Sequence, residues 1–195
     1  MDGDSAANVE NVAASPSQGH SGHGRPRDSG GRRVMDAKQI AQELADAHEL
    51  LSQASMARLA YNGLDGRPRV IPIGIFWTGD EIVMSTAATA PKVRALSVRP
   101  EVALTIDAGD SPGSAKTLSV RGVVHLTIVD GVVPEYLAAA RKNFDAEYAA
   151  EFERNCRAMY DQMARIAVEP QWARFYDFGA GRVPQFLAEL AKKSS

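Results

Sequence analysis

The residues best suited to chemistry surround the start of a short helix predicted over residues 90–99. The first turn of a helix exposes unpaired N–H groups and the positive end of the helix dipole, so it attracts anions. Thr86 and Thr89 would add hydroxyl donors there, and Lys92 would add a full positive charge. A lysine in a first turn is otherwise unfavourable, because its charge opposes the dipole. The pattern predicts a phosphate-binding site; the alternative is that Lys92 is a solvated surface charge.

Two strands joined by a tight hairpin are expected to deliver these residues to the helix. Residues 67–86 read as strands on both sides of a turn at 78–80, and the second strand ends at Ser85 and Thr86. Pro72 lies inside the first of the two strands. Because proline cannot donate to a β-ladder, this strand is predicted to have a free edge, a bulge or an open face.

The remaining hydrophobic pattern predicts a small barrel with helices at its corners. Most of the expected strands are consecutive and joined by hairpins, which favours antiparallel pairing over a doubly wound fold. The predicted fold class is therefore mainly antiparallel β with helices. A stripe that includes Cys156, Met159 and Met163 predicts one core-facing helix over 147–166. Helices are also expected over 36–53 and 133–144 and near the C-terminus, and strands over 55–63, 101–109, 116–131 and 167–178.

The length, charge and cysteine content of the chain exclude several classes of protein. The chain has 195 residues, of which 45% are hydrophobic, enough for one ordinary domain. Its 22 basic and 24 acidic residues give a net charge of −2, so no nucleic-acid partner is expected. Cys156 is the only cysteine, which excludes an internal disulfide. No apolar run approaches the roughly 20 residues of a membrane helix, and no secretion signal is evident, so a cytoplasmic protein without a membrane partner is expected.

Residues 1–35 differ from the rest of the chain. They are rich in Gly and Ser and contain no Leu, Ile or aromatic residue. Such a segment buries too little apolar surface to offset its ordering entropy, so it is predicted to be a disordered tail. The folded domain is then 36–195. His20 and His23 in the tail are too incomplete a set to predict a metal site.

From about Asp36 to Phe178 the chain resembles the pyridoxamine 5′-phosphate oxidase-like split β-barrels, which include FMN enzymes and coenzyme F420-dependent reductases. Four features carry the resemblance: the run from Arg69 to Ile73, the pair Ser85-Thr86 one hairpin later, Lys92 six residues after that threonine, and the strand segment Thr117–Gly122.

The resemblance implies a bound FMN or coenzyme F420 and a homodimer, because the family builds its cofactor cleft from two subunits. The ring of the cofactor would lie along one strand, its phosphate at the start of the helix, and the edge of the ring near a second strand. The residues implied are Arg69, Val70, Ile71 and Pro72 for the ring, Thr86, Thr89 and Lys92 for the phosphate, Ser85 as a further cofactor-binding residue beside Thr86, and Thr117 at the ring edge.

Three positions depart from the family pattern. The oxidases that make pyridoxal phosphate have a basic residue where this chain has Pro91, and a substrate-holding lysine where it has Gly74. Vitamin B6 phosphate oxidation is therefore not expected. Members that use coenzyme F420 often carry an arginine where this chain has Ala90, and Arg94 is the candidate to replace that charge.

The expected function is an oxidoreductase that transfers hydride between the bound cofactor and a small organic substrate. The cofactor performs the redox chemistry, so no dedicated catalytic residue is predicted. The alternative is a non-catalytic barrel that binds a flavin, haem or another planar ligand, and a barrel without any cofactor is a third possibility. Trp172 and Tyr176 could stack on a ligand, although packing is the commoner role of such residues.

Overall fold

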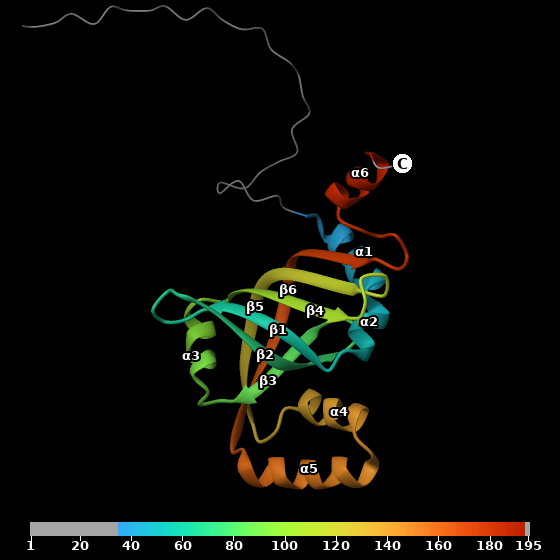
Figure 1. The fold of residues 1–195 in the computed structure, drawn as a ribbon. Coiled ribbons are helices and arrows are strands. Elements are labelled where there is room, and N and C mark those ends of the chain that lie inside the picture. Colours follow the sequence, from blue (N-terminus) through green and yellow to red (C-terminus); the bar gives the residue numbers. More distant parts are fainter. Residues whose placement is uncertain (1–34, 194–195) are drawn as a thin grey trace, which may run out of the picture. The chain divides into compact units, whose positions relative to one another are not determined.

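In the computed structural model, which describes residues 35–193, the chain forms a closed barrel of six antiparallel strands (Figure 1). The strand order β1-β2-β3-β6-β5-β4 confirms the predicted fold class. All but the last residue of the predicted tail lies outside the described residues. The strands are β1 (Met56–Asn62), β2 (Pro68–Trp77), β3 (Ile82–Ala87), β4 (Glu101–Ala108), β5 (Lys116–Asp130) and β6 (Gln162–Asp177), and the helices are α1 (Ala37–Asp46), α2 (His48–Gln53), α3 (Pro91–Val98), α4 (Pro134–Asn143), α5 (Ala146–Met159) and α6 (Gln185–Lys193).

Alternating side chains of the strands fill the barrel. In β4, Val102, Leu104 and Ile106 alternate along the strand and are buried together. Leu50 and Leu51 of α2 join the same hydrophobic core. None of the helices within residues 35–193 is long and apolar enough to cross a bilayer.

Residues 36–53 form two helices rather than the single helix predicted. Asp36 caps α1, because its side chain accepts a hydrogen bond from the backbone N–H of Gln39 at 2.8 Å. The helix stops at Ala47, which is fully buried, and α2 begins at the next residue. α1 lies against β6, whereas α2 lies against β2 and β4. One straight helix could not pack against both of these surfaces.

The helix predicted over 147–166 is wrong after Met159, where α5 ends. Gln162 begins β6, which pairs with β3 on one side and with β5 on the other. Met163 is buried as predicted, but as a strand residue, and Met159 is 70% exposed. The backbone hydrogen bonds offered by two neighbouring strands outweigh the helical spacing of the apolar residues.

The barrel is closed between β2 and β3 by a short ladder only. β2 pairs with β1 along Pro68–Gly74, but it pairs with β3 only along Ile75–Trp77. The first part of β2 therefore has a ladder partner on one side only. Pro72 lies in this part, so of the three alternatives that the proline predicted, the structure has the free edge.

A second free edge lies along the C-terminal half of β6. β3 pairs with β6 only as far as Val168, whereas β5 continues to Asp177. α1 covers the exposed edge, and the buried carboxylate of Glu43 accepts a hydrogen bond from the backbone N–H of Phe175 at 2.7 Å. A side chain thus replaces the strand that is missing on this side.

Gly122 allows β5 and β6 to approach closely at a β-bulge. A Cβ atom at this position would lie 2.0 Å from the carbonyl oxygen of Glu169. We expect Gly122→Ala to lower the free energy of unfolding by roughly 1–3 kcal/mol, because the two strands must move apart. Gly113→Ala is the matched control, since no atom lies within 4 Å of its added Cβ. Denaturant unfolding that shows equal stability for the two variants would contradict this explanation of the bulge.

Candidate functional site

Thr86 and Lys92 meet at the N-terminus of α3. The ammonium group of Lys92 donates a hydrogen bond to Thr86 Oγ1 at 3.3 Å, and both residues are half-buried. Pro91 occupies the first turn of α3, and the N-cap residue Ala90 supplies no side-chain acceptor. Thr89 is exposed beside them. The N-terminal turn therefore combines a cation and hydroxyl donors, a combination that suits a phosphate.

The charge of Lys92 is not neutralised within the described part of the chain, where no salt bridge involves this residue. Arg94 does not reinforce it. Residues two positions apart do not face each other on a helix, and Arg94 is exposed whereas Lys92 lies nearer the buried face of Val93 and Leu96. Lys92 is thus the cation that the helix presents at this point.

The predicted ring-binding residues of β2 lie on two different faces. Val70 and Pro72 point to the outside of the barrel and are exposed, Val70 by 68%. Ile71 points inward and packs against the core. Arg69 shares the face of Ile71 but lies beyond the core, where it forms a 2.9 Å salt bridge with Asp65.

Arg69 and Lys92 are associated with opposite ends of α3. Arg99, just after the helix, donates hydrogen bonds to the carbonyl oxygens of Gly63 and Leu64. A Cβ on Gly63 would lie 3.3 Å from the guanidinium carbon of Arg69, so Arg69 belongs to this end. The two cations could therefore contact only different parts of an extended ligand.

Thr117 lies across the sheet from β2. Thr117 of β5 is the strand partner of Asp107 in β4. The Asp107 carboxylate forms a salt bridge with Arg58 of β1, and Arg58 is the strand partner of Pro72 in β2. Three strand spacings separate Thr117 from Pro72, on the order of 14 Å. The structure therefore does not bring Thr117 to the other predicted residues within one chain.

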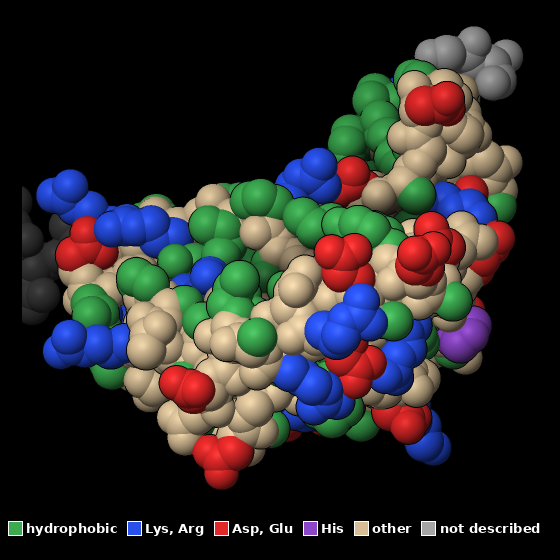
Figure 2. Space-filling model, turned by 90° about the horizontal axis from the view of Figure 1, so that it is seen from below, with side chains coloured by type: hydrophobic (Ala, Val, Ile, Leu, Met, Phe, Trp, Pro, Cys, Tyr) green, Lys and Arg blue, Asp and Glu red, His purple; other side chains and the backbone are tan. Residues whose placement is uncertain are grey.

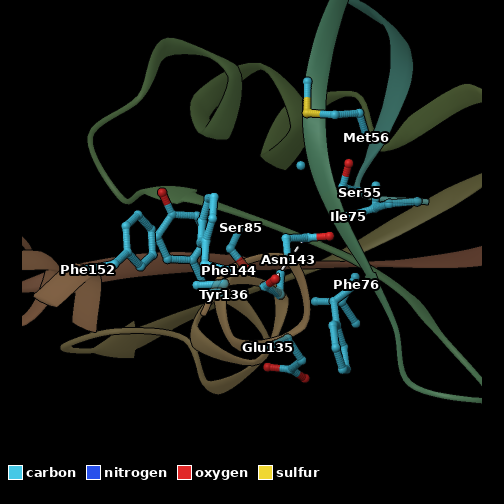
Figure 3. Close-up of a pocket in the computed structure, with 14 residues that line it drawn as sticks. Ser55, Met56, Ile75, Phe76, Ser85, Glu135, Tyr136, Asn143, Phe144 and Phe152 are labelled. Carbon is cyan, nitrogen blue, oxygen red and sulfur yellow. Dashed lines mark hydrogen bonds between the residues drawn. The ribbon is translucent and has the colours of Figure 1, made fainter. Parts of the chain in front are cut away.

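A pocket of about 390 Å³ lies between the outer face of β2 and β3 and the helices α4 and α5. Ser85 lines it, because Ser85 faces outward on β3 while Thr86 faces the opposite way. Figure 3 shows the aromatic rings of Tyr136, Phe144 and Phe152 together on one side and Met56 on the other. The full lining is Ser55, Met56, Gly74, Ile75, Phe76, Val83, Ser85, Glu135, Tyr136, Ala139, Ala140, Asn143, Phe144 and Phe152.

Sequence reasoning missed this pocket, although it identified Ser85. The residues of α4 and α5 that line the pocket come about 60 positions after β2 and β3 in the chain. Phe144, Tyr148 and Phe152 carry a signal, because aromatic residues at this spacing form one face. Rings of Phe144 and Tyr148 lie 4.6 Å apart between centroids, and Tyr136 and Phe152 lie 5.5 Å apart.

A partly exposed ion-pair network of one arginine and two glutamates holds α4 beside the pocket. Arg165 of β6 donates to Glu135 at 2.8 Å and to Glu81 at 2.6 Å. Hydrogen bonding to Glu81 and Glu135 raises the pKa of Arg165, which stays charged. Burial raises the pKa of Tyr136, so its phenol is neutral at physiological pH. Glu135 is the one acidic residue in the described lining.

Aromatic residues near the end of β6 divide between core and surface. Phe175 is buried, whereas Trp172 and Tyr176 are half-buried on the outer face. The guanidinium of Arg121 lies 4.0 Å from the centroid of the Trp172 ring. Tyr176 pairs with Thr117 of β5, so both lie on the outer face of the barrel, and neither lines the pocket. Across residues 35–193, no cluster of three or more His, Cys, Asp or Glu side chains could hold a metal ion.

Comparison with known proteins identifies the family to which this chain belongs. A family model described as pyridoxamine 5′-phosphate oxidase matches residues 44–177. No curated protein matches the sequence. Among solved structures, a conserved hypothetical protein from Mycobacterium tuberculosis has a TM-score of 0.54 at 19% identity, covering 78% of this chain and 91% of that one. This similarity shows the fold.

Two further structures carry functional names. An F420 reductase has a TM-score of 0.50 at 26% identity, covering 65% of this chain and 94% of that chain. A heme binding protein from Mycobacterium smegmatis has a TM-score of 0.47 at 20% identity, covering 76% of this chain and 56% of that chain.

Proposed function

This chain belongs to the pyridoxamine 5′-phosphate oxidase family, and we propose that it is an oxidoreductase that uses FMN or coenzyme F420. It would transfer hydride between that cofactor and a small organic substrate. The observation that carries the proposal is the contact between Lys92 and Thr86 at the N-terminus of α3. The 26% identity with an F420 reductase supports the same class of cofactor.

The residues present fit the phosphate of such a cofactor. Lys92 is half-buried, lacks a carboxylate partner within residues 35–193, and already orients its ammonium toward the hydroxyl of Thr86. A phosphate would accept hydrogen bonds from both groups and from the first-turn N–H groups, and it would remove the unfavourable interaction of Lys92 with the dipole. Thr89 would add an exposed hydroxyl at the rim.

The chain's other residues would position the cofactor ring and exclude water. The free edge of β2 beside Pro72 leaves backbone groups without a neighbouring strand, and a ring could lie along it. The pocket beside Ser85 would hold the substrate next to that edge. The bound cofactor supplies the hydride chemistry, so this chain needs to provide binding and orientation. Gly74 and Pro91 support a reaction other than vitamin B6 phosphate oxidation.

We also propose a homodimer. Val70, Pro72 and Met56 expose apolar surface on the outside of β1 and β2. Figure 2 shows a broad band of hydrophobic side chains between groups of charged ones on the face seen from below Figure 1. Exposed apolar patches of this kind commonly mark protein interfaces. A second copy would also offer its Thr117 to a β2 edge that Thr117 of the same chain does not reach.

Cofactor binding is expected to strengthen this dimer. A ligand that needs both subunits favours the state that holds the complete site. Sedimentation of dilute protein should show a larger dimer fraction with FMN or coenzyme F420 than without. A monomer that binds either cofactor at full affinity would contradict the intersubunit site.

The absorption spectrum of the purified protein after incubation with each cofactor tests the proposal. Retained flavin or deazaflavin absorbance after gel filtration is expected for the cofactor that binds. The reduced cofactor should then be reoxidised faster by an accepted substrate than by buffer, with oxygen excluded. Binding without accelerated reoxidation across quinones, porphyrin-like pigments and other aromatic compounds would favour the non-catalytic binding protein.

A further inference from the structure

We infer that the pocket between the barrel and the helices α4 and α5 selects an uncharged aromatic substrate and rejects anions. The inference deepens the proposed function, since it names the class of substrate that the pocket beside the cofactor would take. It depends on the character of the lining, on the partners of two cations next to lining residues, and on the space above Gly74.

The lining is mostly apolar and aromatic. Tyr136, Phe144 and Phe152 contribute rings from the helices, and Phe76 contributes a ring from β2 (Figure 3). A volume of about 390 Å³ accommodates a molecule of two or three fused rings. Aromatic side chains gain from offset or edge contacts with an aromatic ligand beyond the area that they bury.

Charge within the pocket disfavours an anion. The described lining includes no Lys, Arg or His, and its only carboxylate, Glu135, is 17% exposed. An anion placed here would lose its water shell without gaining a cationic partner, and it would also meet the negative charge of Glu135.

Two cations next to lining residues, Arg165 and Lys142, are engaged elsewhere. Arg165 is shared between Glu135 and Glu81, so two carboxylates already compete for its guanidinium. The ammonium of Lys142 donates to the carbonyl oxygen of Ala54 at 3.0 Å, and Lys142 is exposed outside the lining. Neither group is free to meet a ligand inside the pocket.

Polar groups in the lining suit a neutral ligand with one hydroxyl or carbonyl. Asn143 donates its side-chain amide to the carbonyl oxygen of Ala139 at 2.8 Å, which leaves its own oxygen as an acceptor. Ser85 adds a hydroxyl from β3. Such groups orient a neutral molecule without the cost of burying a charge.

Gly74 leaves the β2 wall of the pocket open. An added Cβ would lie no closer than 3.8 Å to its nearest neighbour, the carbonyl oxygen of Ser55. A longer side chain at this position could therefore enter the pocket without displacing the backbone. This makes Gly74 the position at which the charge preference of the pocket can be changed.

A matched naphthalene series tests the inference by calorimetric titration of the full-length protein, with and without FMN. 2-Naphthol is expected to bind at least about tenfold more tightly than 2-naphthalenesulfonate, the size of effect that one unpaired charge typically produces. Equal or tighter binding of the sulfonate would overturn the inference. Tighter binding of 2-naphthylmethylammonium than of 2-naphthol would also overturn it, because Glu135 would then act as a counter-ion for cationic substrates.

Variants of Gly74 locate the effect in the pocket. Gly74→Lys should raise sulfonate affinity by about tenfold over Gly74→Met, which fills similar space without a charge. Lys142→Gln should leave the sulfonate affinity unchanged. Equal sulfonate affinity in the Lys and Met variants of Gly74 would show that the ligands bind elsewhere.

The outcome with FMN separates this inference from the proposed function. Charge selectivity without any binding of FMN or of coenzyme F420 would retain the pocket inference and reject the oxidoreductase. Displacement of 2-naphthol by FMN would overturn the substrate assignment, because the pocket would then hold the cofactor ring itself.

Discussion

Lys92→Ala is expected to weaken the binding of FMN or coenzyme F420 by about ten- to a hundredfold. The variant removes one charge-assisted contact to a phosphate, worth roughly 1.5–3 kcal/mol, and each 1.4 kcal/mol corresponds to about a factor of ten in affinity. Lys92 is suited to this contact because its ammonium already lies 3.3 Å from Thr86 Oγ1. Fluorescence or absorbance titration of the purified variant measures the change.

The fold should survive this substitution, because removing a positive charge from the first turn of a helix slightly favours the dipole. Riboflavin, which lacks the phosphate, should bind the variant and the wild type alike. Arg94→Ala is the matched control on the same helix, and it should change affinity little because Arg94 points away from Lys92. If Lys92→Ala binds both phosphorylated cofactors as tightly as the wild type, the phosphate lies elsewhere.

The part of the site that could be predicted from the sequence is the part built from neighbouring segments. Thr86 and Lys92 are six residues apart, and a strand end followed by a helix start brings them together by local geometry alone. The free edge of β2 was predictable for a similar reason. Pro72 has no backbone N–H, so it cannot donate a hydrogen bond to a neighbouring strand.

The pocket depends instead on packing between distant segments. Periodicity indicates which side chains of α5 share a face, but it does not indicate which surface that face covers. The same limit explains the error after Met159. Residues 162–166 continue the helical spacing, yet their backbone pairs with β3 and β5, and only the tertiary structure decides between these alternatives.

Glu43 shows the same limit within α1. Its neighbours in sequence indicate an amphipathic helix with a polar glutamate, whereas the structure buries the carboxylate against the free edge of β6. The partners, Arg174 and Arg182, lie about 130 residues later in the chain. No spacing rule connects residues so far apart, although the strand that lacks a neighbour requires some acceptor for its N–H groups.

Glu43→Ala is expected to lower the free energy of unfolding by roughly 2–4 kcal/mol. The side chain is 8% exposed and accepts from Arg174 at 2.8 Å, from Arg182 at 2.6 Å and from the backbone N–H of Phe175 at 2.7 Å. Its removal leaves a buried N–H without an acceptor and two guanidinium groups without their shared carboxylate. Both arginines retain partial exposure and can be rehydrated, which keeps the loss below that of a fully buried ion pair.

The contributions can be separated by two further variants in denaturant unfolding. Glu43→Gln keeps an oxygen that can accept from Phe175, so it should lose about half as much stability as Glu43→Ala, because the neutral hydrogen bond survives and the ionic ones weaken. Glu49→Ala on the adjacent helix removes an exposed carboxylate paired with Lys116, and such surface pairs contribute little to stability. A loss for Glu43→Ala no larger than that for Glu49→Ala would show that water, rather than Glu43, satisfies the open edge of β6. The larger loss is expected because the edge is covered by α1, and a buried backbone donor with no protein acceptor costs more than a surface charge that returns to solvent.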